Sequence, residues 1–114
     1  MRRQLTLLRH AKSSWDDSKL KDRHRPLNDR GERDAPLMGQ RLRARGASPT
    51  LIITSPAVRA RRTAQIIARE IGYPQEFLQR EEELYLASPD EIMAVLARQD
   101  SSLKDVVVCG HNPG

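Results

Sequence analysis

The stretch DVVVC, residues 105 to 109, places four consecutive apolar side chains after Asp105. A strand with one face in water alternates apolar and polar side chains, whereas a strand covered on both faces is apolar throughout. Strands of the second kind are typical of parallel sheets that lie between layers of helices. Residues 105 to 109 therefore predict a buried strand in a domain of the α/β class.

Two other runs predict further strands. Residues 4 to 8 (QLTLL) and residues 50 to 54 (TLIIT) are rich in apolar and β-branched side chains. Helical segments separate the three strands, and strand–helix–strand units of this kind join parallel strands by right-handed crossovers. No repeat, linker or low-complexity tract marks a boundary, so residues 1 to 114 predict a single domain, a three-layer α/β/α fold with a mainly parallel sheet.

The first helix is expected to begin at Asn28 or Asp29, either of which can cap its start, and to end at Gly46. Proline has no N–H and clashes with the preceding turn, so Pro36 is expected to kink or divide this helix. The residues that recur on its buried side are Ala35, Met38 and Leu42.

Two serine–proline pairs predict the starts of two more helices. Ser55 is expected as the N-cap and Pro56 as the first residue of a helix that runs to about Glu70. Residues 88 to 91 (SPDE) have the pattern of a capping box at the start of the other. Its expected buried side consists of Ile92, Met93, Val95 and Leu96. Between these helices, residues 77 to 85 are ambiguous, with a short extended piece as one interpretation.

The charge balance favours acidic partners without deciding their class. The 114 residues include 20 Lys and Arg against 15 Asp and Glu, which gives a formal net charge of +5 and a pI near 10.0. No apolar run approaches the roughly 20 residues that span a bilayer, so no membrane partner is expected. The single cysteine, Cys109, cannot form an internal disulfide, and we expect a buried thiol in a cytoplasmic protein.

Polar residues follow the three predicted strands with no spacer. They are Arg9 and His10, Ser55 and then Arg59, and Gly110 and His111. The carboxyl ends of parallel strands meet at one edge of a sheet, where open α/β folds bind their ligands. Arg59 also lies in the first turn of its helix, where backbone N–H groups attract anions. The spacing therefore predicts a phosphate pocket that gathers two histidines and at least two arginines.

Four ordered motifs resemble the histidine phosphatase superfamily. They are LLRHAKSSW (residues 7 to 15), RPL with the following NDRG (25 to 31), SPAVRARRTA (55 to 64) and the terminal GHNPG (110 to 114). The wider superfamily usually has glycine where Ala11 stands, and this alanine and the small size look most like the SixA-type phosphohistidine phosphatase branch. The resemblance implies the phosphoglycerate mutase-like fold and a reaction without a metal or organic cofactor.

The resemblance implies a role for each matching residue. His10 is the nucleophile that forms a covalent phosphohistidine, and a neutral imidazole is suited to this near pH 7. Arg9, Arg25 and Arg59 bind the phosphoryl oxygens, while His111 donates a hydrogen bond to the transferring group. Glu83 is the best match to the carboxylate that serves many members as general acid. A phosphohistidine substrate can release an imidazole that is already protonated, so this acid is not required for every substrate.

We therefore expect a hydrolase that removes phosphate from phosphohistidine on a protein and releases inorganic phosphate. The alternative in the same superfamily is a small-molecule phosphomonoesterase or mutase, which would need Glu83 as its acid. A hypothesis of another class is a non-catalytic phosphate or nucleic-acid binding module, which the basic pI suggests. Aromatic residues make up 4% of the chain, and single-strand binders need such rings for stacking, so no nucleic-acid partner is expected.

The sequence ends at Gly114, five residues after its most apolar strand. Helices normally cover both faces of such a strand. We therefore expect a domain that is truncated at its carboxyl end and exposes apolar surface on that flank.

Overall fold

A computed structural model describes residues 4–9, 21–99 and 102–110. Within these ranges the strands are β1 (Gln4–Arg9), β2 (Leu51–Thr54), β3 (Gln79–Arg80) and β4 (Asp105–Gly110). They form one sheet in the order β1-β4-β2-β3, and each neighbouring pair is parallel. The three predicted strands are confirmed, and the two-residue β3 is the short extended piece in the ambiguous segment.

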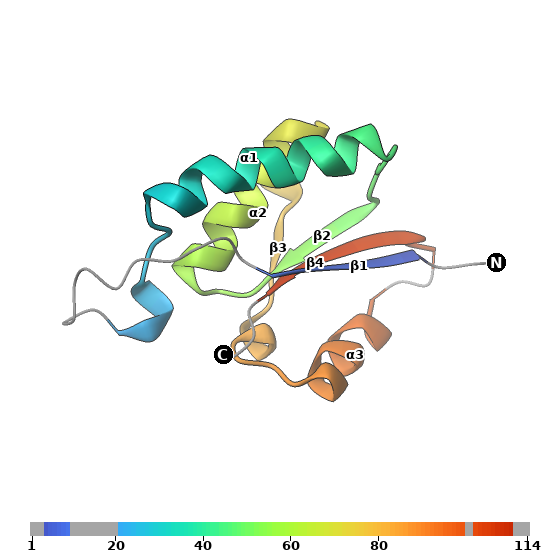
Figure 1. The fold of residues 1–114 in the computed structure, drawn as a ribbon. Coiled ribbons are helices and arrows are strands. Elements are labelled where there is room, and N and C mark those ends of the chain that lie inside the picture. The colour runs from blue at the N-terminus through green and yellow to red at the C-terminus, as the bar shows by residue number, and fades with distance from the viewer. Residues whose placement is uncertain (1–3, 10–20, 100–101, 111–114) are drawn as a thin grey trace.

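Helices cover both faces of the sheet (Figure 1). α1 (Asp29–Ala44) and α2 (Val58–Ile71) lie on one face, and α3 (Pro89–Ala97) lies on the other. The chain passes from β1 to β2 and on to β3, and then turns back to β4. With right-handed crossovers, this change of direction puts α3 on the opposite face from α1 and α2. The predicted three-layer α/β/α architecture is confirmed.

β4 lies between β1 and β2, and both of its faces are buried. Residues 106 to 109 are each at most 2% exposed. Val106 and Val108 pack on the α3 side with residues that include Leu51, Ile53, Val95 and Leu96. Val107 and Cys109 pack on the α2 side with Ile52, Ala64 and Ala68. The continuous apolar run therefore has the cause that we predicted, because alternate side chains enter two different cores.

β1 lies at the edge of the sheet as far as the structure describes it. Leu8 packs against the cluster on the α2 side. Leu5 and Leu7 are directed to the other side and are 38% and 58% exposed. The cluster beneath α3 draws its strand residues from β2 and β4, so these two leucines lie beyond it. The exposed apolar surface that we expected beside residues 105 to 109 therefore belongs to β1, while β4 is covered.

α1 begins as predicted but is not divided. Asn28 Oδ1 accepts a hydrogen bond of 2.8 Å from the Gly31 N–H, which confirms the N-cap. At the other end Gly46 has a φ of 77°, a left-handed conformation that glycine adopts without strain. The helix continues through Pro36, because Ala35, the residue before it, and Gly39, three residues after it, are both buried against α2. Packing thus outweighs the one backbone hydrogen bond that proline removes.

The predicted start of α2 is wrong by two residues. Its N-cap is Ala57, and Pro56 precedes the helix. The cause lies in the sheet, because the Ser55 N–H donates to the Cys109 carbonyl at 2.9 Å and so keeps residue 55 extended beside β4. Ser55 Oγ accepts a 3.3 Å hydrogen bond from the Ala57 N–H and stabilises the turn into the helix. The predicted end is confirmed within one residue by Gly72, whose φ is 78°.

α3 begins with the predicted capping box between Ser88 and Glu91. Val95 and Leu96 are buried as expected, but the placement of Met93 on the buried side is wrong, since it is 56% exposed.

Two short 3-10 turns, η2 (Gln75–Phe77) and η3 (Glu82–Leu84), flank β3. Among the described residues, no helix combines the length and the apolarity that crossing a membrane would require.

Candidate active site

The carboxyl ends of β1, β4 and β2 lie side by side. Arg9 pairs with Gly110 in the register of β1 and β4, and Thr54 pairs with Cys109 in the register of β4 and β2. Neighbouring strands in a sheet are about 4.8 Å apart, so the residues that follow these ends start from adjacent points. His10 and His111 are the next residues after Arg9 and Gly110 and lie outside the described residues. The structure thus confirms the predicted shared edge up to the residue before each histidine.

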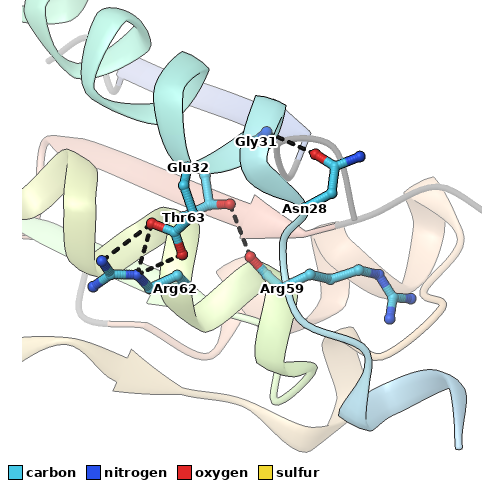
Figure 2. A network of polar contacts seen from close by, with 6 residues as sticks. All are labelled: Asn28, Gly31, Glu32, Arg59, Arg62 and Thr63. Atoms are coloured by element: carbon cyan, nitrogen blue, oxygen red, sulfur yellow. Dashed lines mark hydrogen bonds and ion pairs between the residues drawn. The ribbon is translucent and has the colours of Figure 1, made fainter. Parts of the chain in front are cut away.

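Arg59 is the second residue of α2 and has the largest fully buried side chain in the part of the chain that the structure describes, at 2% exposure. Its carbonyl accepts a 2.8 Å hydrogen bond from Thr63 Oγ1, and its guanidinium points away from the ion pair that Arg62 of α2 forms with Glu32 of α1 (Figure 2). Among the described residues no group accepts a hydrogen bond from its Nε, although the residue makes other polar contacts. A buried cation at the amino end of a helix, near the carboxyl edge of the sheet, is suited to an anion.

Arg25 is the second buried arginine, at 6% exposure. It follows the 3-10 turn η1 (Asp22–His24), which contacts α2, so the segments that carry Arg25 and Arg59 are neighbours. The next residue but one, Leu27, packs with Ala35 and Ile66 between α1 and α2. Burying charge is costly unless it is compensated, and phosphoryl oxygens match the planar fork of arginine. Arg25 and Arg59, which these segments carry and which are predicted to bind phosphate, are therefore both buried.

Arg62 lies on the same helix as Arg59 but has a different role. It forms a two-pronged ion pair with Glu32 of α1, with Nε to Oε1 at 3.0 Å and Nη2 to Oε2 at 3.1 Å (Figure 2). The arginine side chain is 40% exposed and the glutamate 41%. Arg62 therefore joins two helices at the surface, a contact between residues too distant in sequence to be predicted from helical spacing.

These features fit one family. The model of the histidine phosphatase superfamily (branch 1) matches residues 5–92 of the chain. The chain belongs to this superfamily. The uncharacterised protein Rv1276c of Mycobacterium tuberculosis is 35% identical over 106 residues, which are 93% of this chain and 63% of that protein. The chain thus spans less than two thirds of the length of this relative.

Two further comparisons place the chain within the superfamily. A crystal structure from Agrobacterium tumefaciens, provisionally assigned as the phosphohistidine phosphatase SixA, superposes with a TM-score of 0.87 at 30% identity and covers 99% of this chain and 71% of that one. The phosphoglycerate mutase of Schizosaccharomyces pombe is 39% identical over 74 residues, which are 61% of this chain and 34% of the mutase. The phosphoglycerate mutase-like fold is therefore confirmed. The relatives of this chain include a protein assigned as a phosphohistidine phosphatase and a phosphoglycerate mutase.

Glu83, the general-acid candidate from the superfamily match, lies in η3 with its carboxylate directed to Arg98. Arg98 Nη1 is 2.9 Å from Glu83 Oε1 and 2.8 Å from Oε2. The glutamate side chain is 60% exposed. The pKa of Arg98 is raised above its ordinary value, first by the hydrogen bond to Glu83. To donate a proton to a leaving group, Glu83 would have to leave this partner.

Cys109 is buried beside the edge but is unsuited to the chemistry of the superfamily. Its Sγ donates to the Ala60 carbonyl at 3.4 Å, and burial raises the pKa of the thiol from 9.0 to about 12. A thiol that keeps its proton is a poor nucleophile. The prediction of a buried thiol is confirmed. In the described ranges, no three His, Cys, Asp or Glu side chains gather in a group that could hold a metal ion.

The sequence did not single out Arg23 in η1, which the structure shows in contact with the loop after β3. Its Nη2 is 2.7 Å from Glu82 Oε2, and its guanidinium lies over the Tyr85 ring, 5.1 Å from the centroid. Arg23 and Glu82 are 59 residues apart in the sequence. Nothing in the charged segment from 11 to 27 distinguishes this arginine from its neighbours, so no sequence signal could have identified it.

Proposed function

We propose that this chain is a phosphatase that hydrolyses phosphohistidine on a protein through a covalent phosphohistidine on His10. The observation that carries the proposal is the burial of Arg25 and Arg59 near the sheet edge where β1 and β4 end just before His10 and His111. The similarity to the SixA-assigned protein of A. tumefaciens supports the substrate class. The proposed location is the cytoplasm, in keeping with a free, buried Cys109.

The proposed reaction has two displacements at phosphorus. A ring nitrogen of neutral His10 attacks, an N–P bond to His10 forms, and the N–P bond of the substrate breaks. The bonding pair returns to the substrate imidazole, which leaves as a neutral ring when its other nitrogen already carries a proton. Water then attacks phosphorus, the N–P bond to His10 breaks, and inorganic phosphate leaves with the proton of the water transferred to the products.

The arginines and His111 have different roles in the proposed reaction. Arg9, Arg25 and Arg59 would hold the phosphoryl oxygens, and a donor from His111 would stabilise the charge that gathers on them in the transition state. No described side chain has to supply a proton to the leaving imidazole. The proposal therefore does not depend on Glu83.

The second candidate is a phosphomonoesterase or mutase that acts on a small molecule. The similarity to the S. pombe phosphoglycerate mutase favours it. An alkoxide leaving group needs a proton, and Glu83 would have to provide it after leaving Arg98. The ion pair of Glu83 is the observation that ranks this candidate second.

The test compares two substrates on the same preparation. Release of inorganic phosphate is measured from a phosphohistidine peptide and from 3-phosphoglycerate, with parent protein and His10→Ala. The proposal expects higher kcat/KM on the peptide and loss of that activity in His10→Ala, with tungstate, a phosphate analogue, still bound. A preference for 3-phosphoglycerate would support the second candidate, and tungstate binding without turnover in the parent would support a non-catalytic module.

A further inference from the structure

Arg23 joins two segments that are far apart in sequence and close to the proposed phosphate site. From η1 it reaches Glu82 at 2.7 Å and lies over Tyr85 at 5.1 Å from the ring centroid. Both partners belong to the loop that follows β3, at the carboxyl edge of the sheet. A single guanidinium thus makes an ion pair and a cation–π contact with one loop, while its own backbone belongs to another.

The backbone on Arg23's side leads directly to Arg25. Beyond Arg25 the chain is fixed by Pro26, whose ring restricts φ, and by Leu27, which is buried between α1 and α2. Before Arg25 the contacts include the turn hydrogen bond from the His24 N–H to the Lys21 carbonyl, 2.9 Å, the packing of η1 on α2, and the two contacts of Arg23. Arg23 therefore supplies a side-chain anchor on the amino side of the buried Arg25.

The loop that receives Arg23 is itself held in a demanding conformation. Leu86, next to Tyr85, has a φ of 53°, which is uncommon for a residue with a side chain. Such a backbone persists where surrounding contacts determine it. Leu84 on one side is buried in the core beneath α3, and Ser88 on the other caps that helix. The loop is therefore a fixed point against which η1 can be held.

We propose that Arg23 is a positioning residue, which fixes η1 against the loop 82–85 and so holds Arg25 where it binds the phosphoryl group. The inference rests on the proposed function, since it takes Arg25 as a phosphate ligand. Arg23 itself touches no reacting atom. Exposed ion pairs by themselves contribute little, and these side chains are 39% and 64% exposed, so a purely structural pair would leave anion affinity unchanged.

The experiment measures the tungstate Kd and kcat/KM on a phosphohistidine peptide. Arg23→Ala is expected to weaken tungstate binding and to lower kcat/KM about three- to tenfold through KM, the size expected when one ion pair and one cation–π contact are lost. Tyr85→Leu and Glu82→Gln approach the same contacts from the other loop and are expected to give smaller losses in the same direction. They keep the test open if Arg23→Ala folds poorly.

Arg98→Ala is the matched control. Arg98 also forms an exposed ion pair with η3, at 2.8 Å to Glu83, but it is the C-cap of α3, and its described ion pairs are with Glu81 and Glu83 rather than with η1. Its removal is expected to leave the tungstate Kd unchanged. The double variant Arg23→Glu with Glu82→Arg is expected to recover part of the lost affinity, because it restores the ion pair with its charges exchanged.

Two results would overturn the inference. One is an Arg23→Ala variant whose tungstate affinity and kcat/KM equal those of the parent. The other is a loss of tungstate affinity in Arg98→Ala as large as the loss in Arg23→Ala. Failure of the proposed function gives a different pattern, namely no turnover by the parent. In that case tungstate affinity still decides the role of Arg23 in holding the anion-binding arginine.

Discussion

Arg9 lies directly opposite Gly110 in the parallel register of β1 and β4. The two strands therefore reach the edge of the sheet at the same level, and the next residue of each is one of the two histidines proposed to take part in phosphoryl transfer. Chain segments about a hundred residues apart are brought together by backbone hydrogen bonds, before any side chain of the site is considered. The pairing makes the arginines around this edge the natural targets for substitution.

Arg59→Lys is expected to lower kcat/KM about a hundredfold, the usual cost of removing one well-placed donor from a transition state. Lysine keeps the charge but has no planar fork to hold two phosphoryl oxygens. Steady-state kinetics on a phosphohistidine peptide measures the effect. Arg62→Lys, three residues along the same helix, removes the fork from the surface pair with Glu32 and is expected to retain parental activity. Equal losses in both variants would contradict a phosphate-binding role for Arg59.

Glu83→Gln separates the two substrate classes. Because the carboxylate is held by Arg98, we expect kcat on a phosphohistidine peptide to stay within about twofold of the parent. On a phosphate ester, where an acid must protonate the leaving oxygen, any parental activity should fall by about a hundredfold or more. Parallel assays of phosphate release check this. A large loss on the peptide would show that Glu83 is needed for the proposed reaction as well.

The raised pKa of the buried Cys109 thiol predicts that the folded state loses stability at alkaline pH. The unfolded thiol ionises near its ordinary pKa of 9.0, whereas burial raises the folded pKa to about 12. The folded state therefore binds more protons between these values, and its free energy of unfolding falls as pH rises above 9, by at most about 1.4 kcal/mol per pH unit. Below pH 9 this contribution is fully present.

Urea denaturation from pH 7 to 11 measures the effect. Cys109→Val is the control, because it keeps the tyrosines and lysines that also titrate in this range. The difference in unfolding free energy between parent and variant should be constant below pH 9 and decline above it. A constant difference up to pH 11 would mean that the thiol is not protected by burial.

Gly39→Ala tests how closely α1 and α2 approach. A Cβ on Gly39 would lie 2.7 Å from the Cβ of Glu70 and 3.3 Å from the Cα of Ile67, positions that cannot yield without moving α2. Alanine favours helix by about 1 kcal/mol over glycine, but overpacking costs roughly 1 to 3 kcal/mol. We expect a net loss of about 1 kcal/mol in urea denaturation. Gln40→Ala, exposed on the same helix, should cause no loss, and a stabilised Gly39→Ala would show that the helices can separate freely.

The sequence predicted most where a single local cause decides the structure. Residues 105 to 109 are apolar because both faces of β4 are covered, and Asn28 caps α1 through a bond to Gly31, so both predictions are confirmed. Ser55 was misassigned as an N-cap because a hydrogen bond from its N–H to the Cys109 carbonyl holds it against the neighbouring strand β4. Met93 was misplaced because helical period alone does not fix which way a short helix is turned on its sheet.

The site was predictable as far as strands and motif positions determine it. Arg25 and Arg59 were identified from their motifs, and their burial agrees with a binding role. The placement of His10 and His111 was predicted from the strand ends and lies beyond the described residues. Contacts such as Arg23 with Glu82 and Tyr85 join loops whose approach depends on the whole fold, and no spacing rule covers them.

The strand that delivers His10 is hydrogen-bonded to β4 on one side, and Leu5 and Leu7 on it are exposed. β4 has neighbours on both sides, and its residues 106 to 109 are buried. In hydrogen exchange, the amides of β1 should therefore lose protection before those of β4, through local openings that leave the rest of the sheet intact. The two strands that lead to the histidines would then differ in how firmly they are held, and heating should abolish turnover through release of β1 before the fold as a whole melts.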